Sequence, residues 1–77
     1  MPRLSCNFRE FIEIIEAHGF TLHRHKGTSH RRYRGVVEGQ VKFVEVDPHS
    51  SMTEQIGDRL LSTMIRQCGL SKKLFRK

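Results

Sequence analysis

Residues 23–35 concentrate the side chains that could do acid–base chemistry on an anion. The segment reads His-Arg-His-Lys-Gly-Thr-Ser-His-Arg-Arg-Tyr-Arg-Gly, with five of the fourteen Lys and Arg of the chain and no Asp or Glu. Histidine exchanges protons close to neutral pH, and guanidinium groups bind phosphate oxygens. The segment therefore predicts a polyanionic partner, with His30 as the candidate residue for chemistry on it.

Two other chemistries would use the same residue types. His23, His25 and His30 could supply three imidazoles to a catalytic zinc ion. No acidic residue of the segment is available to orient them, and five cations crowd the same place. A nucleophilic triad would need an Asp beside Ser29 and His30, and none accompanies this pair in the sequence. We therefore expect a site with no metal and no cofactor.

The size and charge of the chain favour an open binding surface. Its 77 residues suffice for one small domain with a modest core, so a deep cavity is not expected. The net charge of +6 attracts nucleic acid or an anionic membrane surface. No apolar run could span a bilayer, and the first residues lack the apolar segment of a signal peptide, so we expect a cytoplasmic protein. Cys6 and Cys68 are then expected to be reduced packing residues.

The first element that must support this segment is a helix. Asn7 can cap its first turn, with Glu10 as the capping-box partner, and Gly19 is the expected stop. Helical spacing is shown by four apolar residues: Phe8, Phe11, Ile12 and Ile15.

After Gly19 the apolar period changes to two, which predicts strands. In the strand 20–25 we expect Phe20 and Leu22 to face the core, and three residues to face solvent: Thr21, His23 and His25. The loop 26–29 leads to a second strand, 30–37. If Tyr33 is buried, three side chains lie together on its solvent side: His30, Arg32 and Arg34.

The remainder of the chain predicts a third strand and a second helix. Glu38-Gly39 is typical of a hairpin turn before a strand at 40–46, and the segment 47–51 breaks that strand. The helix 58–67 carries the apolar stripe Leu61, Met64, Ile65 and Cys68. Ser71 can cap a last short turn, and we expect the basic tail 72–77 to be solvated.

These elements predict an α+β fold in the order αβββα. Two amphipathic helices would cover one face of a three-stranded antiparallel sheet and leave the other face to solvent. We expect a single domain over residues 1–77, with its core at about 8–71. The candidate site then lies on the solvent-facing side of the sheet.

Three motifs in this order resemble one protein family. They are the Gly-Phe entry to the first strand, the run Lys26-Gly27-Thr28-Ser29-His30-Arg31-Arg32-Tyr33, and the sequence Gln67-Cys68-Gly69-Leu70-Ser71. Together they resemble the HicA toxins of bacterial toxin–antitoxin systems, whose loop Lys-Gly-Ser-His is followed three residues later by an aromatic. Thr28 is an extra residue in that loop.

The resemblance implies a fold like the double-stranded-RNA-binding domain and an endoribonuclease that cuts mRNA. It also implies a HicB-type antitoxin as partner, with the toxin a monomer when free and part of a hetero-oligomer when neutralised. The family's catalytic histidine corresponds to His30. RNA contacts are expected from the residues around it: Arg24, His25, Lys26, Gly27, Ser29, Arg32 and Arg34.

RNA carries its own nucleophile, the 2′-hydroxyl, so the protein need only move protons and stabilise charge. His30 can act as the general acid–base, and neighbouring guanidinium groups can stabilise the phosphate charge. The second proton carrier stays open between His25, His23 and water. Two alternatives also stay open: a non-catalytic RNA-binding module, which needs only shape and phosphate contacts, and a basic face that docks an acidic protein.

Overall fold

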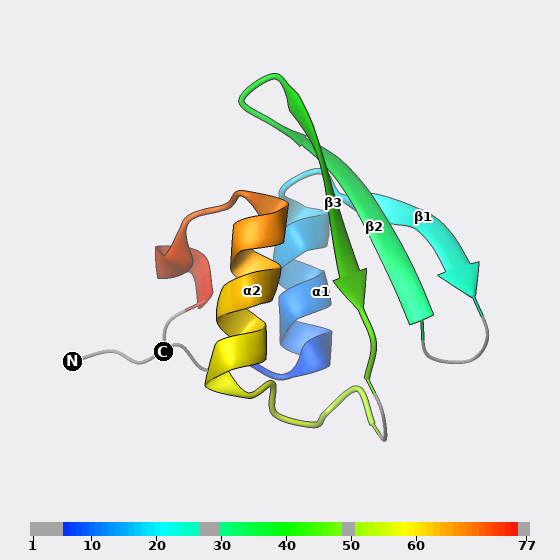
Figure 1. Cartoon of the computed structure of the whole chain (residues 1–77), viewed down its shortest axis with the longest axis vertical. Helices are drawn as coiled ribbons and strands as arrows, with labels where there is room; N and C mark the ends of the chain where they lie inside the picture. Colours follow the sequence, from blue (N-terminus) through cyan, green and yellow to red (C-terminus); the bar gives the residue numbers. More distant parts are fainter. Residues whose placement is uncertain (1–5, 27–29, 49–50, 76–77) are drawn as a thin grey trace.

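The computed structural model describes residues 6–26, 30–48 and 51–75. Its elements are α1 (Phe8–Ala17), β1 (Thr21–Lys26), β2 (His30–Val37), β3 (Gln40–Val46), α2 (Asp58–Cys68) and the short 3-10 helix η1 (Lys72–Phe75). The strands form one antiparallel sheet in the order β1-β2-β3 (Figure 1). The predicted α+β fold and element order are confirmed. Of the predicted loop 26–29, Lys26 is instead the last residue of β1, and Gly27, Thr28 and Ser29 lie outside the described residues.

Both helices begin and end where their sequences predict. The side chain of Asn7 accepts a hydrogen bond from the N–H of Glu10 at 2.7 Å, and the Glu10 carboxylate accepts one from the N–H of Asn7 at 3.0 Å. This reciprocal capping box satisfies two N–H groups that the helix leaves unpaired. Gly19 and Gly69 follow the helices with φ of +93° and +73°, a conformation that glycine adopts without steric cost. Neither helix, nor any other among the described residues, is long and apolar enough to cross a membrane.

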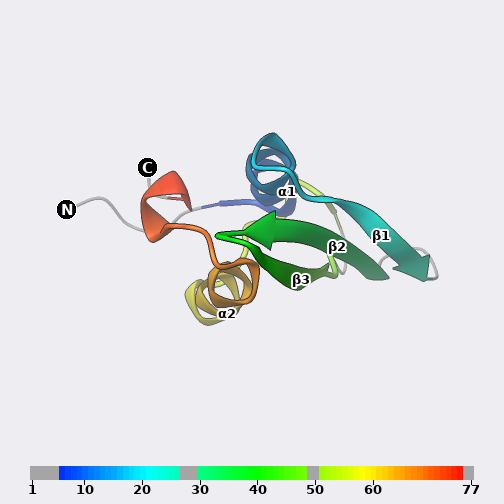
Figure 2. The same cartoon turned by 90° about the horizontal axis from the view of Figure 1, so that it is seen from above.

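One continuous core joins the helices to one side of the sheet. The stripes predicted for α1 and α2 are buried, and they meet Tyr33, Val44 and Val46 of the sheet. Tyr33 pairs with Val44, and Val46 lies two residues further along β3, so all three side chains point to the same face. We call this the inner face. Figure 2 shows α1 nearer to β1 and α2 nearer to β3.

The two cysteines are buried in this core as reduced packing residues, as predicted. Burial raises the pKa of the Cys68 thiol above its usual value, while hydrogen bonding to the backbone acts in the opposite direction. The Cys68 Sγ also donates to the carbonyl oxygen of Ile65 at 3.2 Å. Because the thiolate is the reactive form, burial disfavours chemistry at this residue.

Two expectations about packing were wrong. Leu22 points to the inner face with its partner Tyr33, but its side chain is 49% exposed. β1 is an edge strand that runs away from the helices in both views (Figures 1 and 2), so little of the core reaches it. The tail is not wholly solvated either, because Phe75 is buried and its ring stacks on Phe11 with centroids 5.1 Å apart. Ser71 does cap this last turn, since its Oγ accepts from the N–H of Lys73 at 3.3 Å.

Gly35 lies on the inner face of β2 directly under the ring of Phe20. A Cβ at this position would come within 2.6 Å of the ring carbons, a distance that real Cβ contacts do not reach. We predict that Gly35→Ala lowers the free energy of unfolding by about 1–3 kcal/mol, the usual cost of overpacking a core. Urea denaturation would measure it. Val36→Thr is the matched control, because Val36 is the next residue, lies on the opposite face and is 53% exposed; an equal loss in both variants would contradict the prediction.

Candidate active site on the outer face of the sheet

The face of the sheet opposite the helices carries most of the predicted site residues that the structure describes. His30, Arg32 and Arg34 alternate along β2 with the buried residues Tyr33 and Gly35, and all three are exposed. These three residues and their cross-strand neighbours form the outer face of the sheet. The predicted register of β2 is therefore confirmed, with the candidate base and two guanidinium groups on one solvent-facing surface.

A bulge in β1 changes which of its residues join this face. Thr21 pairs with Arg34, but Arg24 pairs with Arg32, so β1 has one extra residue in between. An extra residue inverts the alternation beyond it. Arg24 therefore lies on the outer face beside Arg32, and the backbone position of Lys26 is opposite His30.

The same bulge removes His25 from the site. His25 pairs with Arg31, which in turn pairs with the buried Val46, so His25 belongs to the inner face. His23 and His25 were expected on one face of the sheet; both are exposed, but only His23 lies on the outer face. Its ring contacts the outer-face ring of Phe43, with centroids 5.4 Å apart.

His30 has a carboxylate partner that was not predicted from the sequence. Its Nε2 lies 3.3 Å from Oδ2 of Asp47, while its side chain is 68% exposed and that of Asp47 is 29% exposed. The expectation that no Asp accompanies His30 was wrong, because Asp47 is distant in sequence and adjacent across the sheet. The sequence did contain a signal for this contact. If residues are paired outward from the turn at Glu38-Gly39, His30 comes to lie opposite Asp47.

Asp47 also connects His30 to a groove at the free edge of β3. One of its carboxylate oxygens, Oδ1, is buried and has no hydrogen-bond partner among the described residues. A groove of about 220 Å³ separates this edge from α2, and its lining residues are Glu45, Asp47, Leu60, Thr63, Met64 and Gln67. An unpaired buried carboxylate oxygen is costly to stability, so a position that tolerates one is a candidate for function.

The contact with Asp47 leaves one ring nitrogen of His30 free for chemistry. If the neutral ring donates its Nε2–H to the carboxylate, Nδ1 carries a lone pair and is directed away from Asp47. A carboxylate that holds an imidazole in this way fixes both its tautomer and its orientation. His30 thus lies on an exposed surface, with the carboxylate of Asp47 beside its Nε2.

The described residues do not bring together the ligands of the alternative zinc site. No group of three or more His, Cys, Asp or Glu side chains among them is arranged to hold a metal ion. His25 is on the inner face, so it does not converge with His23 and His30.

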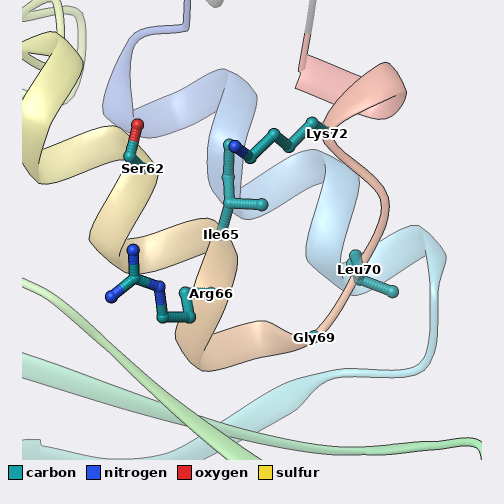
Figure 3. A pocket seen from close by; sticks show the side chains of 6 residues that line it. All are labelled: Ser62, Ile65, Arg66, Gly69, Leu70 and Lys72. Carbon is teal, nitrogen blue, oxygen red and sulfur yellow. The ribbon is translucent and has the colours of Figure 1, made fainter.

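A second hollow, of about 210 Å³, lies at the end of α2 (Figure 3). Its lining residues are Ser62, Ile65, Arg66, Gly69, Leu70 and Lys72. It contains two cations and neither a histidine nor a carboxylate. The candidate acid–base pair, His30 and Asp47, therefore lies on the outer face and not in this hollow.

These features define a class: a small α+β domain whose candidate site lies on an exposed sheet face that carries His30 and several arginines. The family model of the HicA toxins of bacterial toxin–antitoxin systems matches residues 8–70. The match covers most of the chain, so the chain belongs to the HicA toxin family, and it is the toxin of a system that includes an antitoxin. No curated protein and no solved structure gives a match.

The position of Asp47 predicts an unusual stability result. We expect Asp47→Asn to leave the free energy of unfolding within about 1 kcal/mol of the wild type, or to raise it. The exposed partner His30 makes the ion pair weak, and the substitution removes a charge from a site with an unpaired buried oxygen. Urea denaturation would test this. A loss above about 2 kcal/mol would mean that Asp47 is kept for structure.

Proposed function

We propose that this HicA-family toxin is a metal-independent endoribonuclease that cleaves mRNA in the cytoplasm and is neutralised by a HicB-type antitoxin. The observation that carries the proposal is the exposed His30–Asp47 pair on a face that also presents Arg32 and Arg34. Such a face is open to a long polymer, and it combines a proton carrier with phosphate-binding cations. Family membership supports the same reading.

The reaction needs little from the protein beyond proton transfer and charge stabilisation. Nδ1 of His30 takes the proton of the 2′-hydroxyl, whose oxygen attacks the adjacent phosphorus. The bond from phosphorus to the 5′-oxygen breaks, which leaves a 2′,3′-cyclic phosphate and a 5′-hydroxyl. Guanidinium groups of Arg32, Arg34 and Arg24 stabilise the added negative charge on the phosphate. The proton on His30 then returns to solvent.

Water is the proposed proton donor to the leaving oxygen. The bulge in β1 takes His25 to the inner face, and His23 is engaged with Phe43. Neither histidine therefore shares the immediate surroundings of His30. One oriented histidine assisted by water gives a modest nuclease, since positioned acid–base groups each contribute roughly 10²–10⁴ in rate.

We predict that inducing the wild-type chain in a bacterium arrests growth, and that His30→Ala relieves the arrest. Purified His30→Ala should cleave RNA about 10²–10⁴-fold more slowly than the wild type. His25→Ala is the matched control, because it removes an exposed imidazole of the same hairpin from the opposite face. Its cleavage should stay within about threefold of the wild type.

Normal toxicity from a folded His30→Ala variant would overturn the assignment. A chelator should leave cleavage unchanged, and loss of activity with EDTA would show that a metal takes part. Wild-type protein that binds RNA without shortening it, once freed of antitoxin, would favour the non-catalytic RNA-binding module.

We predict that Asp47 and His30 act as one unit in cleavage. Asp47→Asn should slow cleavage by at least about tenfold. The double variant Asp47→Asn/His30→Ala should be no slower than His30→Ala alone, because Asp47 acts only by orienting the imidazole ring that His30→Ala removes. Glu45→Gln is the control, since it removes an exposed carboxylate of β3 that lies two residues before Asp47. Independent, multiplicative effects of the two substitutions would contradict this role.

A further inference from the structure

A cluster of flat side chains lies on the outer face, and the chemistry assigned to His30 does not use it. The guanidinium carbon of Arg32 sits 4.6 Å from the centroid of the Phe43 ring. The ring of His23 meets the same phenyl ring edge-on, with centroids 5.4 Å apart and planes at 62°. Each strand of the sheet contributes one member: β1 His23, β2 Arg32 and β3 Phe43.

The core does not explain the presence of an aromatic residue at position 43. Phe43 pairs with Arg34, whereas the core residues of β3, Val44 and Val46, point to the other face. Two further apolar side chains continue the outer face beyond Phe43: Val36 and Val41 pair with each other and are 53% and 48% exposed. The result is an apolar strip bordered by cations on a surface that the described residues leave uncovered.

We propose that His23, Phe43 and Arg32 form a stacking site for an unpaired nucleobase. An aromatic ring beside a guanidinium plane offers two π surfaces on which a base can stack. The neighbouring cations would hold the phosphates on either side of that base, because Arg34 pairs with Phe43 and Arg24 pairs with Arg32. Glu45 is the cross-strand partner of Arg32 on β3, but no salt bridge joins Arg32 to any described residue, and its guanidinium group lies over the Phe43 ring.

The geometry favours a single strand over a duplex. The cluster is shallow and spread over three strands, so a base must be splayed from its neighbours to lie flat against it. In a duplex, bases are stacked and paired, and recognition relies on shape and backbone contacts. The stacking site therefore adds a single-strand preference to the proposed ribonuclease, and it rests on that proposed function for its biological role.

Binding of a short fluorescein-labelled oligo(A) RNA tests the site directly. The assay uses the full chain with His30→Ala, so that the RNA stays intact. Phe43→Ala in this background should weaken binding roughly 5- to 150-fold, the range that base–aromatic stacking provides. Phe43→Trp should bind within about threefold of the parent. Phe43→Leu, which keeps the apolar bulk without the π system, should resemble Phe43→Ala.

Two further variants separate stacking from charge. Val41→Ala removes an apolar side chain from the same strand and face, and it should change binding less than about twofold. Arg32→Gln should reduce the slope of log affinity against log salt by about 0.7, whereas Phe43→Ala should leave that slope unchanged. Annealing the probe to its complement should weaken binding to the Phe43-containing parent.

Several outcomes would overturn the proposal. They are parental affinity in Phe43→Ala, full binding by Phe43→Leu, or equal affinity for the duplex. Loss of antitoxin binding without loss of RNA binding in Phe43→Ala would instead identify a protein-docking strip. The proposed ribonuclease function is tested separately. If the wild-type protein does not cleave RNA but binds single strands through Phe43, the stacking site is supported and the cleavage assignment is wrong.

Discussion

The register between β2 and β3 is the constraint on which the candidate site depends. It begins at the two-residue turn Glu38-Gly39, where both residues have positive φ, +52° and +78°. A turn of this kind matches the twist of the strands that it joins and permits one pairing. From Val37 opposite Gln40 the pairing runs without interruption to Arg31 opposite Val46. The next step sets His30 opposite Asp47, and a shift of one residue would bury the arginines and expose Tyr33.

The pairing of β1 with β2 is irregular, and this irregularity decides which side chains reach the candidate site. Its pairing with β2 is interrupted by one extra residue, which brings Arg24 to the outer face and takes His25 away from it. The outer face thereby gains a cation beside Arg32 and loses an imidazole near His30. Bulges commonly occur next to active sites, where they re-aim a side chain. In the proposed site, the bulge therefore adds a cation for phosphate binding and removes a candidate second proton carrier.

The sequence predicted the elements well because each has its own local signal. The capping box at Asn7 and the glycines after both helices satisfy backbone groups locally, and the alternation around Tyr33 gives the face of β2. The burial of Phe75 against Phe11 could not be predicted in this way, because it depends on where the chain end meets α1. The exposure of Leu22 likewise depends on how far the helices extend over an edge strand.

The candidate site was predictable only in part, for the same physical reason. Composition and alternation indicated His30, Arg32 and Arg34, since these three lie on one regular strand. Asp47 follows β3, and its proximity to His30 can be predicted only from the pairing register of the whole β2–β3 hairpin. The bulge that displaces His25 has no comparable signal, because the residues 21–26 alternate as well in one register as in the other.

An open face of this kind places conflicting demands on a small protein. A 77-residue chain has one modest core, and here that core occupies one side of the sheet. The other side concentrates like charges at Arg24, Arg32 and Arg34, and it exposes Val36 and Val41. Repulsion lowers stability and the exposed apolar area contributes none, but a polyanion that neutralises the cations and covers the strip would relieve the repulsion and bury that area. An antitoxin that inhibits by occupying this face would need acidic residues facing the arginines and apolar residues facing the valines, so inhibition and stabilisation would come from the same contacts.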